Sequence, residues 1–313
     1  PDPGPAVTPP APRPPEATGT PARGVLVTGE GGTPLAAAPG GAPYGRLRAN
    51  VALSYDRRKD GWARVLTPCE NRAWAPLRSG EVVESVDVVI DPGHGAGEPG
   101  AVGPTGLTEA ELNMDVARRT VAALRRAGVS AALARPHNSR VTLVSRVAIA
   151  KALRPAAFVS IHHNAAPDVT NQPKPGSEMY YQIASAESKR LAGLLYVETI
   201  DALSAFPAQW AADTDAGAKV RRNLSGGDYY GILRHSFNGG VTGVLAEMAF
   251  ISNPSEEALL LRNDVRDAEA AAVTRALVRF LRTDDQGAGF VDAYARNAPA
   301  GGGGGAGGCV DPG

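Results

Sequence analysis

The chain has 313 residues, of which 43% are hydrophobic, and its 32 basic and 32 acidic side chains give a formal net charge of zero. Because a neutral chain has no general electrostatic attraction for nucleic acid or for an anionic membrane, we expect no nucleic acid partner. No segment has the unbroken apolar length of a membrane span. The hydrophobic content suffices for one large core and a smaller one.

Residues 1–23 are rich in proline and alanine, which predicts an extended, disordered tether without a core. Since the chain begins at Pro1, we expect that an N-terminal signal, of the lipoprotein type or another, has been removed. The expected location is therefore extracytoplasmic: secreted, periplasmic, cell-wall associated or membrane-anchored.

Residues 24–80 contain short apolar runs between glycine, proline and aspartate turns, and this pattern predicts a small, all-β, barrel-like domain. The step Gly61-Trp62-Ala63-Arg64-Val65 resembles the bacterial Src-homology-3-like modules, which would make this domain a binding module. The alternative is a β-rich segment that merely packs on the rest of the chain. The predicted strands cover residues 24–28, 45–53, 61–65 and 72–77.

Residues 84–283 alternate between strand-like and helix-like patterns, which predicts an α/β domain with a mainly parallel sheet and helices on both faces. The last helix has the clearest start, with Asn253 as N-cap, Pro254 in the first turn and Glu256 at the third helical position. Strands are predicted at 86–90, 129–134, 157–162, 177–183 and 241–248, and helices at 109–127, 141–153, 185–203 and from 254 onward.

Two other segments have no clear period. We interpret residues 204–230 as a lid or a rim around the substrate site. Because they have neither the length nor the periodicity of an inhibitory helix that would block this site, we expect the site to be open. The glycine-rich composition near the C-terminus predicts that residues 284–313 form a flexible tail. Cys69 and Cys309 could pair in an oxidising compartment, although their spacing does not decide whether they approach each other. Because the chain lacks zinc-type cysteine spacing, a metal would be held by nitrogen and oxygen.

Polar side chains follow three predicted strands. His94 follows the run that ends at Asp91-Pro92-Gly93, His162 ends the second strand and Glu247 ends the third. Glu109 lies in the first turn of a helix behind its N-cap Thr108. Two neutral imidazoles and one carboxylate, with water in the fourth position, form a known catalytic zinc set. The candidate zinc ligands are therefore His94, Glu109 and His162.

Neighbouring residues offer alternatives to two of these ligands. His163 competes with His162, and only one of the pair can face a metal because consecutive side chains on a strand point to opposite faces. Glu111 competes with Glu109 but points about 200° further around the helix. His137 is predicted to be a solvated turn residue, and His235 a structural residue or one at the rim of the cleft.

The strand end at His94, the helix-opening Glu109, the segment 160–164 and the segment 245–253 together resemble the zinc-dependent N-acetylmuramoyl-L-alanine amidases that cut peptidoglycan. The resemblance covers roughly residues 86–283, and the four motifs stand in the family's order. It implies that His94, Glu109 and His162 bind Zn²⁺, which favours His162 over His163, and that Glu247 assists catalysis. Two departures occur: His163 replaces a small residue, and Ala249 replaces the glycine usual after the catalytic glutamate.

The resemblance implies hydrolysis of the amide bond between the lactyl group of N-acetylmuramate and L-alanine of the stem peptide, by a zinc-activated water. Peptidoglycan is the expected partner, and we expect a monomer. A zinc exopeptidase is the first alternative, and it would need a positive group, such as Arg135 or Arg146, to hold a peptide terminus. A non-catalytic wall-binding regulator is the second, and loss of any of the four groups would favour it.

Overall fold

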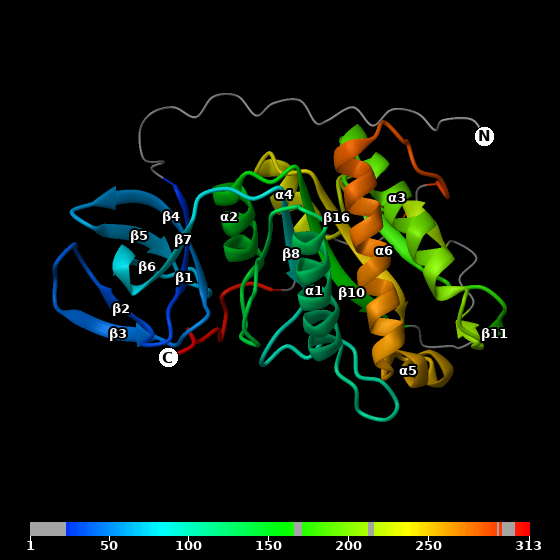
Figure 1. The fold of residues 1–313 in the computed structure, drawn as a ribbon, viewed down its shortest axis with the longest axis horizontal. Coiled ribbons are helices and arrows are strands. Elements are labelled where there is room, and N and C mark those ends of the chain that lie inside the picture. The colour runs from blue at the N-terminus through cyan, green and yellow to red at the C-terminus, as the bar shows by residue number, and fades with distance from the viewer. Residues whose placement is uncertain (1–22, 166–170, 212–215, 293, 296–303) are drawn as a thin grey trace.

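The fold combines an all-β domain and an α/β domain that pack side by side (Figure 1). A computed structural model describes residues 23–165, 171–211, 216–292, 294–295 and 304–313. The predicted tether at 1–23 lies outside these residues except for Arg23. None of the described helices is both long and apolar enough to cross a membrane.

The small domain is one antiparallel sheet in the order β3-β2-β6-β5-β4-β1-β7. Its core contains Leu26, Leu53 and Val65, which are fully buried. Its elements are β1 (Gly24–Thr28), β2 (Thr33–Ala36), β3 (Pro43–Leu47), β4 (Ala52–Lys59), β5 (Trp62–Leu66), β6 (Arg72–Pro76), the 3-10 helix η1 (Leu77–Ser79) and β7 (Gly80–Val83).

The single strand predicted at 45–53 is wrong. β3 ends at Leu47 and β4 begins at Ala52, because Asn50 adopts a left-handed φ of 60° that no continuous strand allows. The prediction also missed β2 and β7, which have only four residues each and show no clear alternation of apolar and polar side chains.

The larger domain has a six-stranded sheet in the order β14-β12-β16-β10-β8-β9. Four neighbouring strands, β9, β8, β10 and β16, are parallel, whereas β12 runs antiparallel to β16 and β14 follows the direction of β12. The prediction of a mainly parallel sheet is thus only partly confirmed. The described part of the β10–β12 connection contains no helix, whereas a crossover between parallel strands usually contains one. The strands are β8 (Val88–Pro92), β9 (Ala131–Leu133), β10 (Ala157–Asn164), β12 (Glu178–Tyr181), β14 (Gly217–Lys219) and β16 (Gly243–Phe250).

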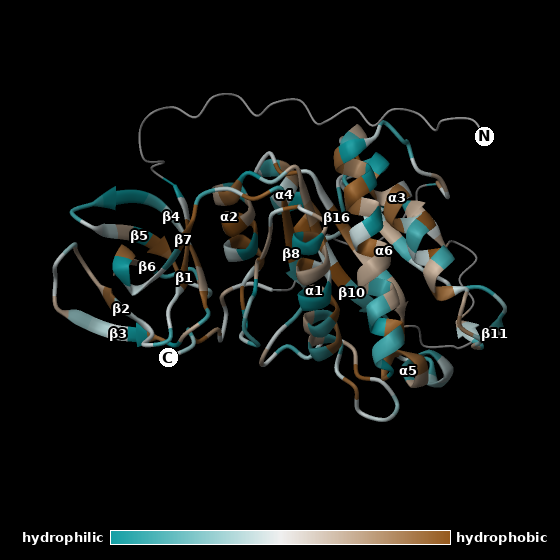
Figure 2. Ribbon diagram, in the orientation of Figure 1, coloured by the Kyte–Doolittle hydropathy of each residue, from teal (hydrophilic) through white to brown (hydrophobic). Residues whose placement is uncertain are grey.

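Helices cover both faces of this sheet. One face packs against α1 (Glu109–Arg126), α3 (Ala186–Leu203) and α6 (Asn263–Arg282), and the other against α2 (Leu143–Leu153) and α4 (Gly231–Asn238). Adjacent residues of β8 divide between the two cores, since Ile90 belongs to the first and Val89 to the second. Figure 2 shows hydrophobic colouring along β8 and β16 and hydrophilic residues on the outer sides of α1 and α6.

The predicted last helix is interrupted. Asn253 caps α5 (Pro254–Leu260) by accepting a hydrogen bond from the Ser255 backbone, as expected, but α6 starts separately at Asn263. The region 204–230 contains β13 (Trp210–Ala211), β14 and β15 (Arg221–Arg222), and α4, which follows it, was not predicted. β13 pairs with β11 (Asn171–Gln172), and β15 pairs with β17 (Tyr294–Ala295).

The two domains share a hydrophobic core. Val25 and Ala52 of the small domain pack in one cluster with Val147 and Leu153 of α2. These four residues are at most 7% exposed. The small domain therefore covers apolar surface of the larger one, which is the packing role considered as an alternative to a binding module.

Residues 304–313 run along both domains and are joined to the small one by a disulfide between Cys69 and Cys309, with a Cα–Cα distance of 5.5 Å. The backbone N–H of Cys69 and the side chain of Asn71 both donate to the Asp311 carboxylate. Leu143 at the start of α2 donates its backbone N–H to the Gly304 carbonyl. The flexible tail that we predicted from residue 284 is thus an attached segment over 304–313, because these contacts fix it.

We predict that a chain beginning at Ser85 with Cys309→Ser unfolds at a lower temperature than the full chain with Cys69→Ser and Cys309→Ser. Truncation exposes Val147 and Leu153, and full exposure of such side chains costs about 1.5–3 kcal/mol each. Thermal unfolding followed by circular dichroism measures the difference. Equal melting temperatures would contradict a supporting role of the small domain.

Candidate metal centre

His94 is positioned by a tight turn after β8. The strand is buried, and the chain then turns at Pro92 and Gly93 into His94, which has a left-handed φ of 59°. A Cβ at Gly93 would overlap the His162 ring, so glycine lets the backbone pass close to that imidazole. The turn thus brings the ends of β8 and β10 together.

Two buried arginines hold this turn in place. Arg146 forms an ion pair with Asp91 (Nη1–Oδ1, 2.6 Å) and donates to the carbonyls of Pro92 and His94. Arg135 donates to the carbonyls of Pro92 and Gly93. Both guanidinium groups therefore have partners in the turn itself, which gives them a structural task distinct from holding a peptide terminus.

Glu109 lies between the two imidazoles at the start of α1, where Thr108 caps the helix by accepting from the Glu111 backbone. Glu109 Oε1 is 2.8 Å from His162 Nδ1, and Glu109 Oε2 is 3.1 Å from His94 Nε2. One ligand atom from each of the three residues lies within 4.8 Å of the others. The three predicted ligands are thus brought together from a loop, a helix and a strand.

The two distances from the carboxylate to the imidazoles are close to those in a tetrahedral site with nitrogen and oxygen ligands. With bonds of about 2.0–2.1 Å, the ligand atoms of a tetrahedral site are about 3.3 Å apart. Burial raises the pKa of Glu109, but hydrogen bonds and charges of His162 and His94 outweigh it and bring the pKa well below its ordinary value. Burial lowers the pKa of His162. An ionised carboxylate and a neutral imidazole are the forms that bind metal.

The competing residues lie elsewhere. His163 is buried on the opposite side of β10, where its ring contacts Asn113 and Glu269. Glu111 is exposed, and its carboxylate accepts from the Thr108 hydroxyl. Neither belongs to the cluster formed by the other three residues.

Glu247 lies on β16 in register with His162 of β10 and with Glu178 of β12. Its Oε2 atom is buried and has no hydrogen-bond partner within the described ranges. Burial, together with the charges of Glu109 and Glu178, raises the pKa of Glu247 well above its ordinary value, against the opposing charge of Arg221. A carboxyl group of this kind binds a proton more readily than an exposed one.

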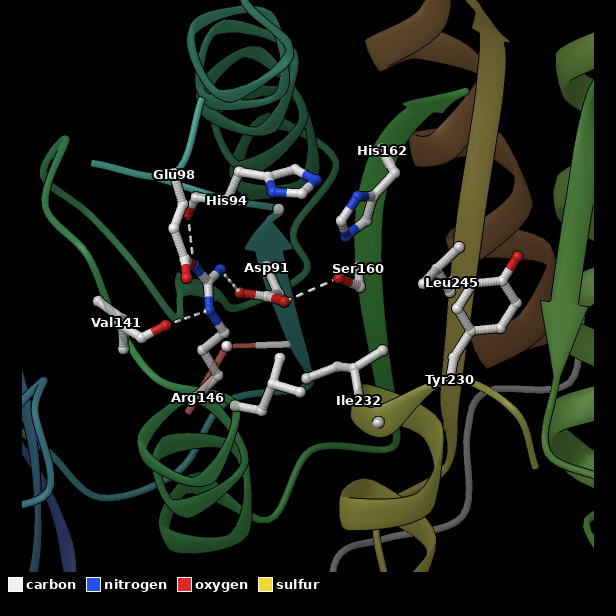
Figure 3. A pocket seen from close by; sticks show the side chains of 14 residues that line it. Asp91, His94, Glu98, Val141, Arg146, Ser160, His162, Tyr230, Ile232 and Leu245 are labelled. Atoms are coloured by element: carbon white, nitrogen blue, oxygen red, sulfur yellow. Dashed lines mark hydrogen bonds and ion pairs between the residues drawn. The ribbon is translucent and has the colours of Figure 1, made fainter. Parts of the chain in front are cut away.

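A cavity of about 410 Å³ opens beside the two imidazoles. Figure 3 shows His94 and His162 at the top, the Asp91–Arg146 pair in the centre and to the left, and Leu245 with Tyr230 on the right, below His162. Gly304 of the attached C-terminal segment also lines it. The mixed lining could hold a substrate group with both polar and apolar parts.

The sequence profile described as N-acetylmuramoyl-L-alanine amidase matches residues 88–279, which is more than half of the chain. The chain belongs to this amidase family.

Individual relatives agree with this assignment. The amidase LytC of Bacillus subtilis is 32% identical over 197 residues, which are 62% of this chain and 35% of that relative. This chain thus spans about a third of the length of LytC.

Two solved structures are similar to this chain: the amidase AmiC2 of Nostoc punctiforme and the catalytic domain of the amidase CwlV of Bacillus (Paenibacillus) polymyxa. Each is 28% identical to this chain, with a TM-score of 0.51. Each match covers 62% of this chain, together with 96% of the AmiC2 chain or 97% of the CwlV chain.

The amidase domain also contains site residues that the sequence did not reveal. Tyr230 lines the cavity but carries no motif signal, and Ser160, which belongs to the motif at 160–164 but was given no role, donates to Asp91 and also lines the cavity. His235 lies exposed on α4 and does not line this cavity, and His137 lies half-buried in a loop after Arg135.

Proposed function

We propose that this chain hydrolyses the amide bond between the lactyl group of N-acetylmuramate and L-alanine of the peptidoglycan stem peptide. One observation carries the proposal: His94, Glu109 and His162 converge, with a buried and ionised carboxylate between two imidazoles, in a chain of the amidase family. We assign these three residues as ligands of Zn²⁺ and Glu247 as the catalytic acid and base.

Zinc held here would supply a water molecule of lowered pKa and polarise the amide carbonyl. Glu247 accepts the proton of the attacking water and then donates it to the departing nitrogen of L-alanine. Its raised pKa suits this exchange, since a group that both accepts and donates works best when its pKa approaches the operating pH. Arg135 and Arg146 keep the turn that carries His94 in position.

The presence of all four groups favours an enzyme over a non-catalytic wall-binding regulator. A zinc exopeptidase finds less support, because the two arginines considered for holding a peptide terminus already bind the turn after β8. We propose residues 84–283 as the catalytic domain and the small β domain as a support for it; the small domain extends beyond the predicted end at residue 80 to Val83, because β7 pairs with β1. The disulfide agrees with an extracytoplasmic location, where such bonds persist.

Purified protein should release free stem peptides from peptidoglycan, and each peptide should carry a new amino terminus on L-alanine. Mass spectrometry of the products, with and without a zinc chelator, tests this outcome. Chelation should abolish release, and added zinc should restore it. Release of single amino acids would instead indicate an exopeptidase.

His94→Ala and His162→Ala should each abolish zinc retention and activity, because each removes one of the three proposed protein ligands. His163→Ala serves as the matched control, and it should still bind one zinc at saturating concentration. Metal analysis of the three purified variants decides the assignment. Loss of zinc from the His163 variant alone would show that the opposite face of β10 binds the metal.

Glu247→Gln should retain zinc yet lose roughly 10²–10⁴-fold in turnover rate, the usual contribution of general acid–base catalysis. Glutamine preserves the size of the side chain but cannot accept the proton. Zinc content and rate are measured on the same sample. Near-normal turnover would contradict the role of Glu247.

A further inference from the structure

A buried carboxylate behind the metal centre has no part in the proposed reaction. The side chain of Glu269 on α6 is 0% exposed. Its Oε1 atom is 3.1 Å from His163 Nε2, and its Oε2 atom is buried without a hydrogen-bond partner in the part of the chain that the structure describes. Burial of a carboxyl group is unfavourable unless the group is well paired. The burial of Glu269 with a single contact, to His163, therefore indicates a role beyond packing.

Further hydrogen bonds lead from His163 toward the metal centre. His163 Nδ1 is 2.7 Å from Asn113 Oδ1, and Asn113 Nδ2 lies 3.3 Å from Glu109 Oε1 and 3.5 Å from the Gly93 carbonyl. Glu269, His163 and Asn113 thus form a continuous chain from α6 through β10 to α1, and it ends on the carboxylate between the two imidazoles. α1 and α6 lie side by side in Figure 1.

The chemistry of these groups fixes the direction of the hydrogen bonds. The Gly93 carbonyl and the ionised Glu109 carboxylate only accept, so the NH₂ group of Asn113 must face them. The Asn113 oxygen therefore accepts from the Nδ1–H of His163. His163 Nε2 and Glu269 Oε1 then share one proton, and a hydrogen bond forms whichever atom holds it.

His163 also acts through its backbone. Its N–H donates to Glu109 Oε1 at 3.2 Å, the same oxygen that Asn113 contacts. Fixing the His163 ring between Asn113 and Glu269 therefore fixes two donors to a single ligand oxygen. Three other contacts of Glu109 do not depend on these hydrogen bonds: the Ala101 backbone N–H and His94 at Oε2, and the predicted ligand His162 at Oε1.

We propose that Glu269, His163 and Asn113 are positioning residues that hold Glu109 in its metal-binding orientation. The inference rests on the proposed zinc site. Hydrogen-bond partners behind a ligand commonly change metal affinity by about 10–100-fold. In this protein the series of hydrogen bonds begins at Glu269, which lies 106 residues from His163 in the sequence.

Zinc affinity, measured by chelator competition, tests the proposal without any enzymatic assay. Glu269→Leu removes the partner of His163 at similar volume, and it should weaken zinc binding by about 10–100-fold. Glu269→Gln should restore near-normal affinity, because its amide can accept from or donate to His163 Nε2. The visible spectrum of the Co²⁺-loaded protein should change in the leucine variant and return in the glutamine variant.

Glu198→Leu provides the matched control. Glu198 on α3 binds Arg275 and Arg279 of the same helix α6 but has no contact with His163. This variant should lower the melting temperature while its zinc affinity and Co²⁺ spectrum stay unchanged. If Glu269→Leu does not fold, Asn113→Ala provides a second test. It interrupts the series of hydrogen bonds next to Glu109 with a residue that favours helices, and it should show the same loss of zinc affinity.

Wild-type zinc affinity in folded Glu269→Leu or Asn113→Ala would overturn the inference. Equal losses in Glu269→Leu and Glu269→Gln would also overturn it, because the effect would then depend on charge rather than on the hydrogen bond. A wild-type chain that binds no zinc would contradict the proposed function itself, so the two failures can be distinguished.

Discussion

The burial of the Glu109 carboxylate at the end of the sheet is the interaction around which the site is built. A charge in this position needs donors on all sides, because desolvation alone would neutralise it. The backbone N–H groups of Ala101 and His163 and the amide of Asn113 provide them. They come from the loop before α1, from β10 and from α1 itself. The site can therefore form only when these three segments are correctly packed.

A second buried carboxylate fixes the loop that leads into Glu109. Glu257 of α5 accepts hydrogen bonds from the backbone N–H groups of Thr105 and Leu107. A Cβ at Gly103 would overlap the Glu257 side chain, so the loop can close over this carboxylate only with glycine there. The loop, in turn, brings the Ala101 N–H to Glu109. α5 thus acts on the metal centre through the backbone of this loop rather than by supplying a ligand.

Local rules predicted the parts of the molecule that depend on neighbouring residues. Thr108 and Asn253 cap their helices as expected, since a cap needs only the next two or three residues. Features that depend on distant partners could not be predicted. The direction of β12 depends on its pairing with β16, and the pairing of Cys69 with Cys309 depends on the path of the whole chain. The buried surroundings of His163 likewise require α6, which sequence spacing does not relate to β10.

The disulfide has a topological consequence for the molecule as a whole. Its two cysteines are 240 residues apart, so the bond closes a covalent ring that contains the entire amidase domain. A single backbone cut anywhere in that ring would leave the two pieces attached to each other. The ring also cannot close before residue 309 has been synthesised and has reached Cys69. Completion of the covalent structure is therefore a late event, after the strands and helices that carry the metal ligands have already been made.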